Sequence, residues 1–331
     1  MKKMAIKFGV LLASLMVATS TLGGSAALAK AHQSSTAHHA TTSHKKAVRA
    51  RASSPDAKKL FAAKKLPAAL PPESIGGYSN GCLAGGVALP MNGPHWQVMR
   101  PLRNRNWGHP GLIDFVKRLS EKAYKDKDSW SGVLVGDMSQ PRGGPMISGH
   151  ASHNIGRDVD LWLTPMPDHI LTEEERNTMS AHSVLKLDSA DFDANYWTDA
   201  HAAFVRNAAE DPEVVRIFVT PAIKKFWCDK RPQNATFPWL SKLRPCPAAQ
   251  CVGHDDHIHI RLKCAPGDKS CIGQPAPDAS DDGCGSELTG ALRDTANDPP
   301  YSSKPDQPSP YEEHPLSKLP KACMRVLNAK P

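Results

Sequence analysis

Two kinds of hydrophobic pattern mark the part of this chain that should fold. Apolar residues recur at the spacing of one helix face in residues 112–125, and shorter segments elsewhere alternate as strands do. The predicted helices are residues 112–125, residues 199–210 with Thr198 as cap, and residues 221–227 with Pro221 in the first turn. The predicted strands are residues 132–136, 157–163, 214–219 and 257–263.

Two of the predicted strands, 157–163 and 257–263, alternate regularly between polar and apolar residues. Such strands are half-buried, which is typical of antiparallel sheets. Together with the helices they predict an α+β fold, an antiparallel sheet with flanking helices. The pattern extends over residues 74–292, which is long enough for one domain with its own core.

The first 29 residues predict a signal peptide. Lys2, Lys3 and Lys7 precede an apolar stretch, and Ala27 and Ala29 form a small-residue cleavage site. The apolar stretch is interrupted and shorter than the ~20 residues that a spanning helix needs. We therefore expect an exported, periplasmic protein with no stable membrane insertion after cleavage of the signal.

Residues 30–73 predict a disordered basic linker, because they lack the aromatic and branched apolar residues needed for a core. Residues 30–72 hold nine Lys or Arg against one acid, Asp56, and the signal segment adds three positive charges. Since the whole chain carries +8, residues 73–331 carry about −3. The positive charge therefore belongs to the leader, which fits anionic wall or membrane surfaces, and no nucleic acid is expected as a partner.

Eight cysteines in an exported chain predict disulfides, because the compartment outside the inner membrane is oxidising. No Cys-x2-Cys spacing occurs, which excludes a zinc finger. The predicted pairs, two from close spacing and two by elimination, are Cys264–Cys271, Cys246–Cys251, Cys228–Cys284 and Cys82–Cys323. The last pair would dock a Pro-rich C-terminal tail, residues 293–331, onto the domain.

Histidines and aspartates gather in two short segments that suit a metal site. His153 is followed seven positions later by Asp160, within the predicted strand 157–163. His257 and His259 point the same way, because alternate residues of a strand share a face. His153, Asp160 and one of these two histidines would give zinc three protein ligands. That pattern leaves one position open for water and is typical of catalytic zinc.

Several of these segments resemble the penicillin-insensitive murein endopeptidase family of zinc peptidases, which is related to lysostaphin-type, D-Ala-D-Ala carboxypeptidase and hedgehog-like domains. The matching motifs are Ser79–Cys82, Gly136–Met138, Gly149–Asp160, Arg216–Val219, His254–His259 and Gly283–Gly285. They occur in the family's order between about residues 74 and 323. The resemblance implies the same α+β architecture and a single zinc peptidase domain.

The resemblance also implies roles for individual residues. Zinc would be held by His153, Asp160 and His259. The place of His257, on the same strand face and one step from the metal, then suits a base or a donor to the oxyanion. A second metal would involve His150 and Asp188, although Asp191 stands where the family has a histidine. From the residues alone, His150 and His254 could bind substrate or orient the site. Arg142 and Arg157 could clamp a substrate carboxylate or could equally be surface charges.

We therefore expect a secreted zinc endopeptidase that acts on peptidoglycan and hydrolyses the D-alanyl to meso-diaminopimelyl cross-bridge, a bond that the resemblance implies. Two alternatives stay open: a D,D-carboxypeptidase and a non-catalytic, zinc-containing wall-binding module. Serine chemistry is disfavoured because no Gly-x-Ser-x-Gly motif occurs.

Overall fold

The computed structural model describes residues 54–126, 130–147, 150–232, 235, 237–247, 253–297 and 312–331. The predicted signal peptide and residues 30–53 of the predicted linker lie outside this part of the chain. Within it, no helix combines the length and the apolar character that crossing a membrane would require.

A seven-stranded sheet forms the centre of the fold, with the strand order β10-β9-β11-β8-β7-β5-β4. Its strands are β4 Asn92–Gly93, β5 Trp96–Val98, β7 Val133–Val135, β8 Asp158–Pro165, β9 Val214–Val219, β10 Leu243–Pro245 and β11 His257–Leu262. The four central strands are antiparallel, as predicted, whereas β5 runs parallel to β7 and β10 parallel to β9. Each parallel pair is joined by a helix, as parallel connections require, so the sheet is mixed at its margins.

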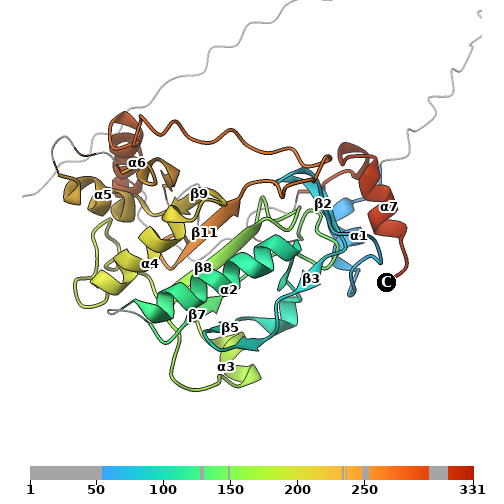
Figure 1. Cartoon of the computed structure of the whole chain (residues 1–331), viewed down its shortest axis with the longest axis horizontal. Helices are drawn as coiled ribbons and strands as arrows, with labels where there is room; N and C mark the ends of the chain where they lie inside the picture. Colours follow the sequence, from blue (N-terminus) through green and yellow to red (C-terminus); the bar gives the residue numbers. More distant parts are fainter. Residues whose placement is uncertain are drawn as a thin grey trace, which may run out of the picture. The chain divides into compact units, whose positions relative to one another are not determined.

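Helices α2 Pro110–Lys125 and α4 Asp199–Glu210 lie across one face of this sheet (Figure 1). Both were predicted, but α2 begins two residues early, because the His109 ring accepts a hydrogen bond from the Gly111 N–H and Pro110 fits the first turn. Helix α5 Pro221–Lys230 connects β9 to β10. The apolar side of β8 packs on this face, in a core that includes Val159, Leu161 and Leu163. The polar side of β8 therefore faces the other way.

The remaining elements complete the folded part. They are α1 Ala57–Ala62, β1 Glu73–Gly77, β2 Asn80–Ala84, β3 Val87–Ala88, η1 Pro101–Arg103, β6 Trp107–Gly108, α3 Glu173–Thr178, η2 Leu240–Lys242, α6 Ser286–Asn297, η3 Leu316–Lys318 and α7 Ala322–Asn328. The predicted domain boundary after residue 292 falls inside α6.

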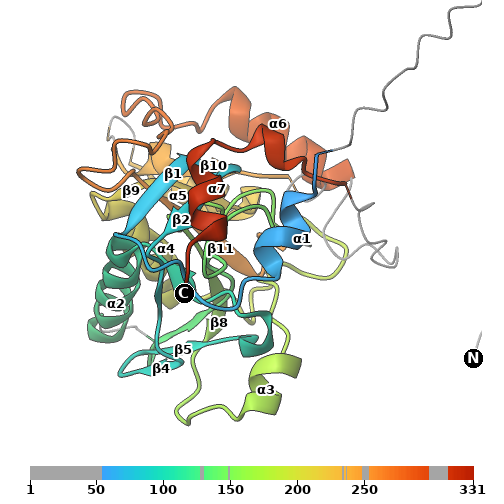
Figure 2. The same cartoon turned by 90° about the vertical axis from the view of Figure 1, so that its right-hand side faces the viewer.

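The two ends of the described chain pack together, which corrects the predicted domain limits. Helices α1 and α7 lie side by side (Figure 2) and share an apolar cluster in which Phe61 is fully buried. Residues 54–73, predicted as disordered linker, are thus folded, and part of the predicted tail is helical. The apolar residues of α1 are too few to form a core of their own. They pack against α7, some 260 positions later in the sequence. The composition of residues 54–73 alone does not show this contact.

Three of the four predicted disulfides are confirmed: Cys82–Cys323, Cys228–Cys284 and Cys264–Cys271. The first of them joins β2 to α7 and docks the tail, as predicted. The fourth prediction, Cys246–Cys251, includes a residue outside the described part of the chain and stays a prediction.

His201 lies in the first turn of helix α4, in an arrangement that requires an uncharged ring. Its Nδ1 accepts hydrogen bonds from the Thr198 N–H and hydroxyl, and its Nε2–H donates to the Leu163 carbonyl at 3.0 Å. A second proton on the ring would break the first two bonds. Burial, more than any other cause, lowers the pKa of His201 to about 4.

We expect this histidine to destabilise the protein in mild acid. Between the ordinary pKa near 6.5 and the folded value, the unfolded chain binds the proton and the folded chain does not, so stability falls as the pH falls. The loss at pH 5 should be about 2 kcal/mol relative to pH 7. His201→Gln keeps an acceptor and a donor at the third helical position but does not titrate. Urea unfolding at both pH values should show a smaller difference in this variant, and an equal difference would assign the effect to another group.

Candidate functional site

The polar side chains of the neighbouring strands β8 and β11 lie on the same face of the sheet and form the floor of the site. The register places Asp160 opposite His259, Trp162 opposite His257, and Asp158 opposite Arg261. Because each strand alternates, these side chains all lie on the sheet face away from α2 and α4.

His153, Asp160 and His259, the three ligands implied by the resemblance, converge at this floor. His153 Nε2 lies 3.2 Å from His259 Nδ1 and 3.4 Å from Asp160 Oδ1, and His259 Nδ1 lies 3.2 Å from Asp160 Oδ1. All three side chains are buried. Ligands about 2.0–2.1 Å from a tetrahedral zinc are about 3.3 Å apart, so the three atoms match three corners of such a site.

The surroundings of Asp160 also suit a cation. Its buried Oδ1 accepts no hydrogen bond from the described residues, although two ring nitrogens face it. Burial opposes charge on His259, but Asp158 and Asp160 outweigh that effect and raise its pKa to about 9. The same negative field that holds a proton there would hold a metal ion.

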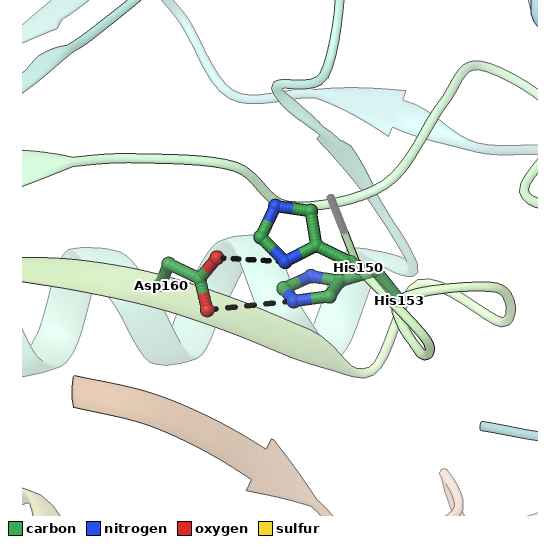
Figure 3. Close-up of side chains that lie close together, drawn as sticks. All are labelled: His150, His153 and Asp160. Atoms are coloured by element: carbon green, nitrogen blue, oxygen red, sulfur yellow. Dashed lines mark ion pairs between the residues drawn. The ribbon is translucent and has the colours of Figure 1, made fainter. Parts of the chain in front are cut away.

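His150 lies beside His153 and adds a further nitrogen, which faces the second oxygen of the Asp160 carboxylate (Figure 3). Its Nδ1 lies 3.4 Å from Asp160 Oδ2, and its Nε2 lies 2.9 Å from Asp137 Oδ2. His150, His153 and Asp160 together form a group that could hold a metal ion.

Asp137 had no predicted role, although its Gly-Asp-Met motif was recognised. Its buried carboxylate contacts Arg103 at 2.9 Å and Arg105 at 2.8 Å besides His150. Burial raises the pKa of Asp137, but His150 and the two arginines more than reverse this and hold it well below its usual range. The carboxylate therefore stays charged and fixes the His150 ring.

The structure gives no support to a second metal held by His150, Asp188 and Asp191. Both aspartates have exposed side chains in the segment before α4, and the possible metal-ligand group found among the described residues does not include them. His150 instead directs its two ring nitrogens to Asp137 and Asp160. Sequence spacing alone could not show which carboxylates the ring would meet.

Asp158 lies behind the predicted ligands and holds two of them in place. It accepts the His153 backbone N–H at 3.0 Å, and its Oδ1 lies 3.5 Å from His259 Nε2. The Arg261 guanidinium pairs with both of its oxygens, at 2.7 and 3.2 Å. Burial opposes the charge, yet Arg261 and His259 keep the pKa of Asp158 far below its usual range. Carboxylates of this kind orient metal-binding histidines.

His257 lies beside the three predicted ligands but further from Asp160. Its Nε2 is 3.9 Å from Asp160 Oδ1, and its Nδ1 is 2.7 Å from Asp256 Oδ1. Burial lowers the pKa of His257, but Asp160 and Asp256 outweigh burial and raise it. The His254 ring packs against that of His257 with centroids 5.0 Å apart.

Arg142 and Arg157 neither clamp a substrate in the pocket nor lie at the surface, the two alternatives left open by the sequence, but are buried and hold the fold together. Buried Arg142 donates to the carbonyls of Leu66 and of three residues at the end of α7, which are Val326, Leu327 and Ala329. Arg157 is also buried and donates to the Lys263 carbonyl. Neither side chain lines the pocket described next.

A pocket of about 160 Å³ opens over the polar floor. Its wall includes Arg100, Arg103, Asp137, Trp162, Asp256 and His257, together with His150 and Asp160. Three carboxylates, two imidazoles and two arginines thus share one cavity, an arrangement suited to acid-base chemistry on a charged ligand.

Comparison with known proteins places this site in a family. Residues 74–328 match the family model described as penicillin-insensitive murein endopeptidase. The chain is 40% identical to the protein of that name from Yersinia enterocolitica, over 67% of this chain and 77% of the relative. It is 37% identical to those from Yersinia pestis, covering 79% and 88%, and Klebsiella pneumoniae, covering 77% and 86%. The chain therefore belongs to the penicillin-insensitive murein endopeptidase family.

Proposed function

We propose that this chain is an exported zinc endopeptidase that cuts the peptide cross-links of peptidoglycan at the D-alanyl to meso-diaminopimelyl bond. The observation that carries the proposal is the set of 3.2–3.4 Å separations among His153 Nε2, Asp160 Oδ1 and His259 Nδ1 beside the pocket. The relatives' names support the substrate class, and the disulfides support export to the periplasm.

Zinc, when bound by His153, Asp160 and His259, would lower the pKa of a bound water to about 7 and polarise the scissile carbonyl. The protein's own residues have two tasks. Asp158 and Asp137 hold the ligand rings and the neighbouring His150 in fixed orientations. His257 moves the proton, because no Glu of a His-Glu-x-x-His helix is present to do so.

The hydrogen bond to Asp256 prepares His257 for this task. With Nδ1–H donating to Asp256 Oδ1, the other nitrogen, Nε2, is left to accept a proton on the pocket side. Asp160 and Asp256 stabilise the imidazolium that results. The same Nε2–H can then be donated to the leaving amine.

The proposal is tested on purified cross-linked muropeptide dimers analysed by mass spectrometry. We expect conversion of dimer to monomers, loss of this activity with a chelator and recovery with added zinc. Penicillin should have no effect, because it acylates a serine and none takes part here. Release of only a terminal D-alanine would favour the carboxypeptidase, and full activity after verified removal of zinc would refute the metallopeptidase. Binding to peptidoglycan without any cleavage would favour the wall-binding module.

A further inference from the structure

We propose that Arg100 recognises a carboxylate attached to the carbon that bears the scissile nitrogen, and so selects the leaving side of the substrate. This inference rests on the proposed endopeptidase function and names a feature of its substrate. Arg142 and Arg157, which the sequence offered as possible carboxylate clamps, donate to backbone carbonyls elsewhere.

The backbone holds Arg100 at the edge of the pocket. The residue follows β5 and has a left-handed conformation, φ 53° and ψ 51°, which is costly for a residue with a side chain. Its N–H donates to the Arg176 carbonyl at 3.0 Å, which fixes this turn. The conformation therefore places the long cationic side chain of Arg100 in the lining of the pocket, which also includes His257.

Trp162 supports the guanidinium of Arg100. The guanidinium carbon lies 5.6 Å from the centroid of the Trp162 ring, within the range of a cation–π contact. Trp162 is the cross-strand neighbour of His257 and lies two residues after Asp160 on the same face of β8. Arg100 thus belongs to the same pocket face as the group that would protonate the leaving amine.

The carboxylates of the pocket are paired with other groups, and none of those described forms an ion pair with Arg100. Asp137 pairs with Arg103 and Arg105, Asp256 with His257, and Asp160 with the ligand histidines. Within the described part of the chain, no carboxylate lies within ion-pair distance of the Arg100 guanidinium. Burial, followed by repulsion from Arg103, lowers the pKa of Arg100, and the attraction of Asp137 and Asp256 offsets this only in part. An anion bound to Arg100 would offset both the burial of its charge and the repulsion from Arg103.

The proposed substrate has an anion at the required place. In the D-alanyl to meso-diaminopimelyl bridge, the scissile nitrogen belongs to an amino-acid centre whose carbon also carries a free carboxylate. Because His257 serves that nitrogen, a carboxylate one carbon away comes to the same side of the pocket. Its planar pair of oxygens suits the forked donors of a guanidinium.

Two matched cross-linked dimers test this assignment. They differ only at that diaminopimelyl centre, which carries a free carboxylate in one and a carboxamide in the other. We expect the wild-type protein to cleave the carboxylate dimer with a kcat/KM about 10- to 100-fold higher, since hydrogen bonds to charged groups contribute about 1.5–3 kcal/mol. Arg100→Gln should remove this preference mainly by raising KM for the carboxylate dimer, and Arg100→Lys should keep part of it.

The control is Arg293→Gln on α6, whose side chain is 74% exposed and, among the described residues, pairs with its neighbour Asp294. It should behave as wild type. Equal cleavage of both dimers by the wild type would refute carboxylate recognition while leaving the endopeptidase function intact. A fall in kcat of the same size on both dimers in Arg100→Gln would show that Arg100 stabilises the oxyanion instead. Cleavage of neither dimer by zinc-loaded wild type would overturn the proposed function and this inference with it.

Discussion

Replacement of His259 by alanine should abolish zinc binding and activity together, whereas replacement of His257 should leave zinc bound and lower turnover. The two histidines are two residues apart on one strand face and are equivalent by sequence alone. They differ in distance, because His259 Nδ1 lies 3.2 Å from Asp160 Oδ1 and His257 Nε2 lies 3.9 Å away. Of these two histidines, only His259 has a nitrogen that forms, with His153 Nε2 and Asp160 Oδ1, three separations that fit a tetrahedral zinc site.

The loss in His257→Ala should be about 10²-fold or more in kcat, the usual contribution of a positioned acid-base or oxyanion group. Zinc content by elemental analysis and turnover on the dimer muropeptide separate the two variants. His254→Ala serves as a neighbour comparison, because its ring packs on His257 without belonging to the predicted ligand set. Retention of zinc in His259→Ala with its loss in His257→Ala would reverse the assignment. Equal zinc loss in both would indicate four protein ligands and a structural zinc.

The sequence contained enough information to predict the floor of the site. Alternation along β8 places Asp160 on the face opposite Leu161, and the same rule pairs His257 with His259. Each of these assignments needs only the alternation of residues within a single strand. For the same reason the central strands and the α4 helix were predicted within a few residues.

Contacts between distant segments could not be predicted in this way. Asp158 was visible as a polar residue of β8, but its pairing with Arg261 depends on the register between strands about 100 residues apart. The direction of Arg100 depends on one left-handed backbone conformation, and that of Arg142 on a tail that docks from the far end of the chain. The pattern of residue types along the chain does not show which distant segments come into contact.

Replacement of Asp158 by asparagine should be among the most destabilising single changes in the domain. The Arg261 guanidinium is buried and pairs with both oxygens of Asp158, so the substitution leaves a buried positive charge without its counter-ion. Breaking a buried pair from one side costs about 3–5 kcal/mol. The change also removes the carboxylate next to His259 Nε2, and loss of such support lowers metal affinity about 10- to 100-fold.

Urea unfolding and competition with a chromophoric zinc chelator measure the two effects separately. Asp229→Asn is the matched control, because Asp229 pairs with Lys225 on the exposed side of α5 and its loss should cost at most about 1 kcal/mol. The double variant Asp158→Asn with Arg261→Met removes both charges and should lose less stability than the two single losses combined. It should still bind zinc weakly, because the contact with His259 is not restored. Wild-type stability in Asp158→Asn, or wild-type zinc affinity in the double variant, would contradict the role assigned to this carboxylate.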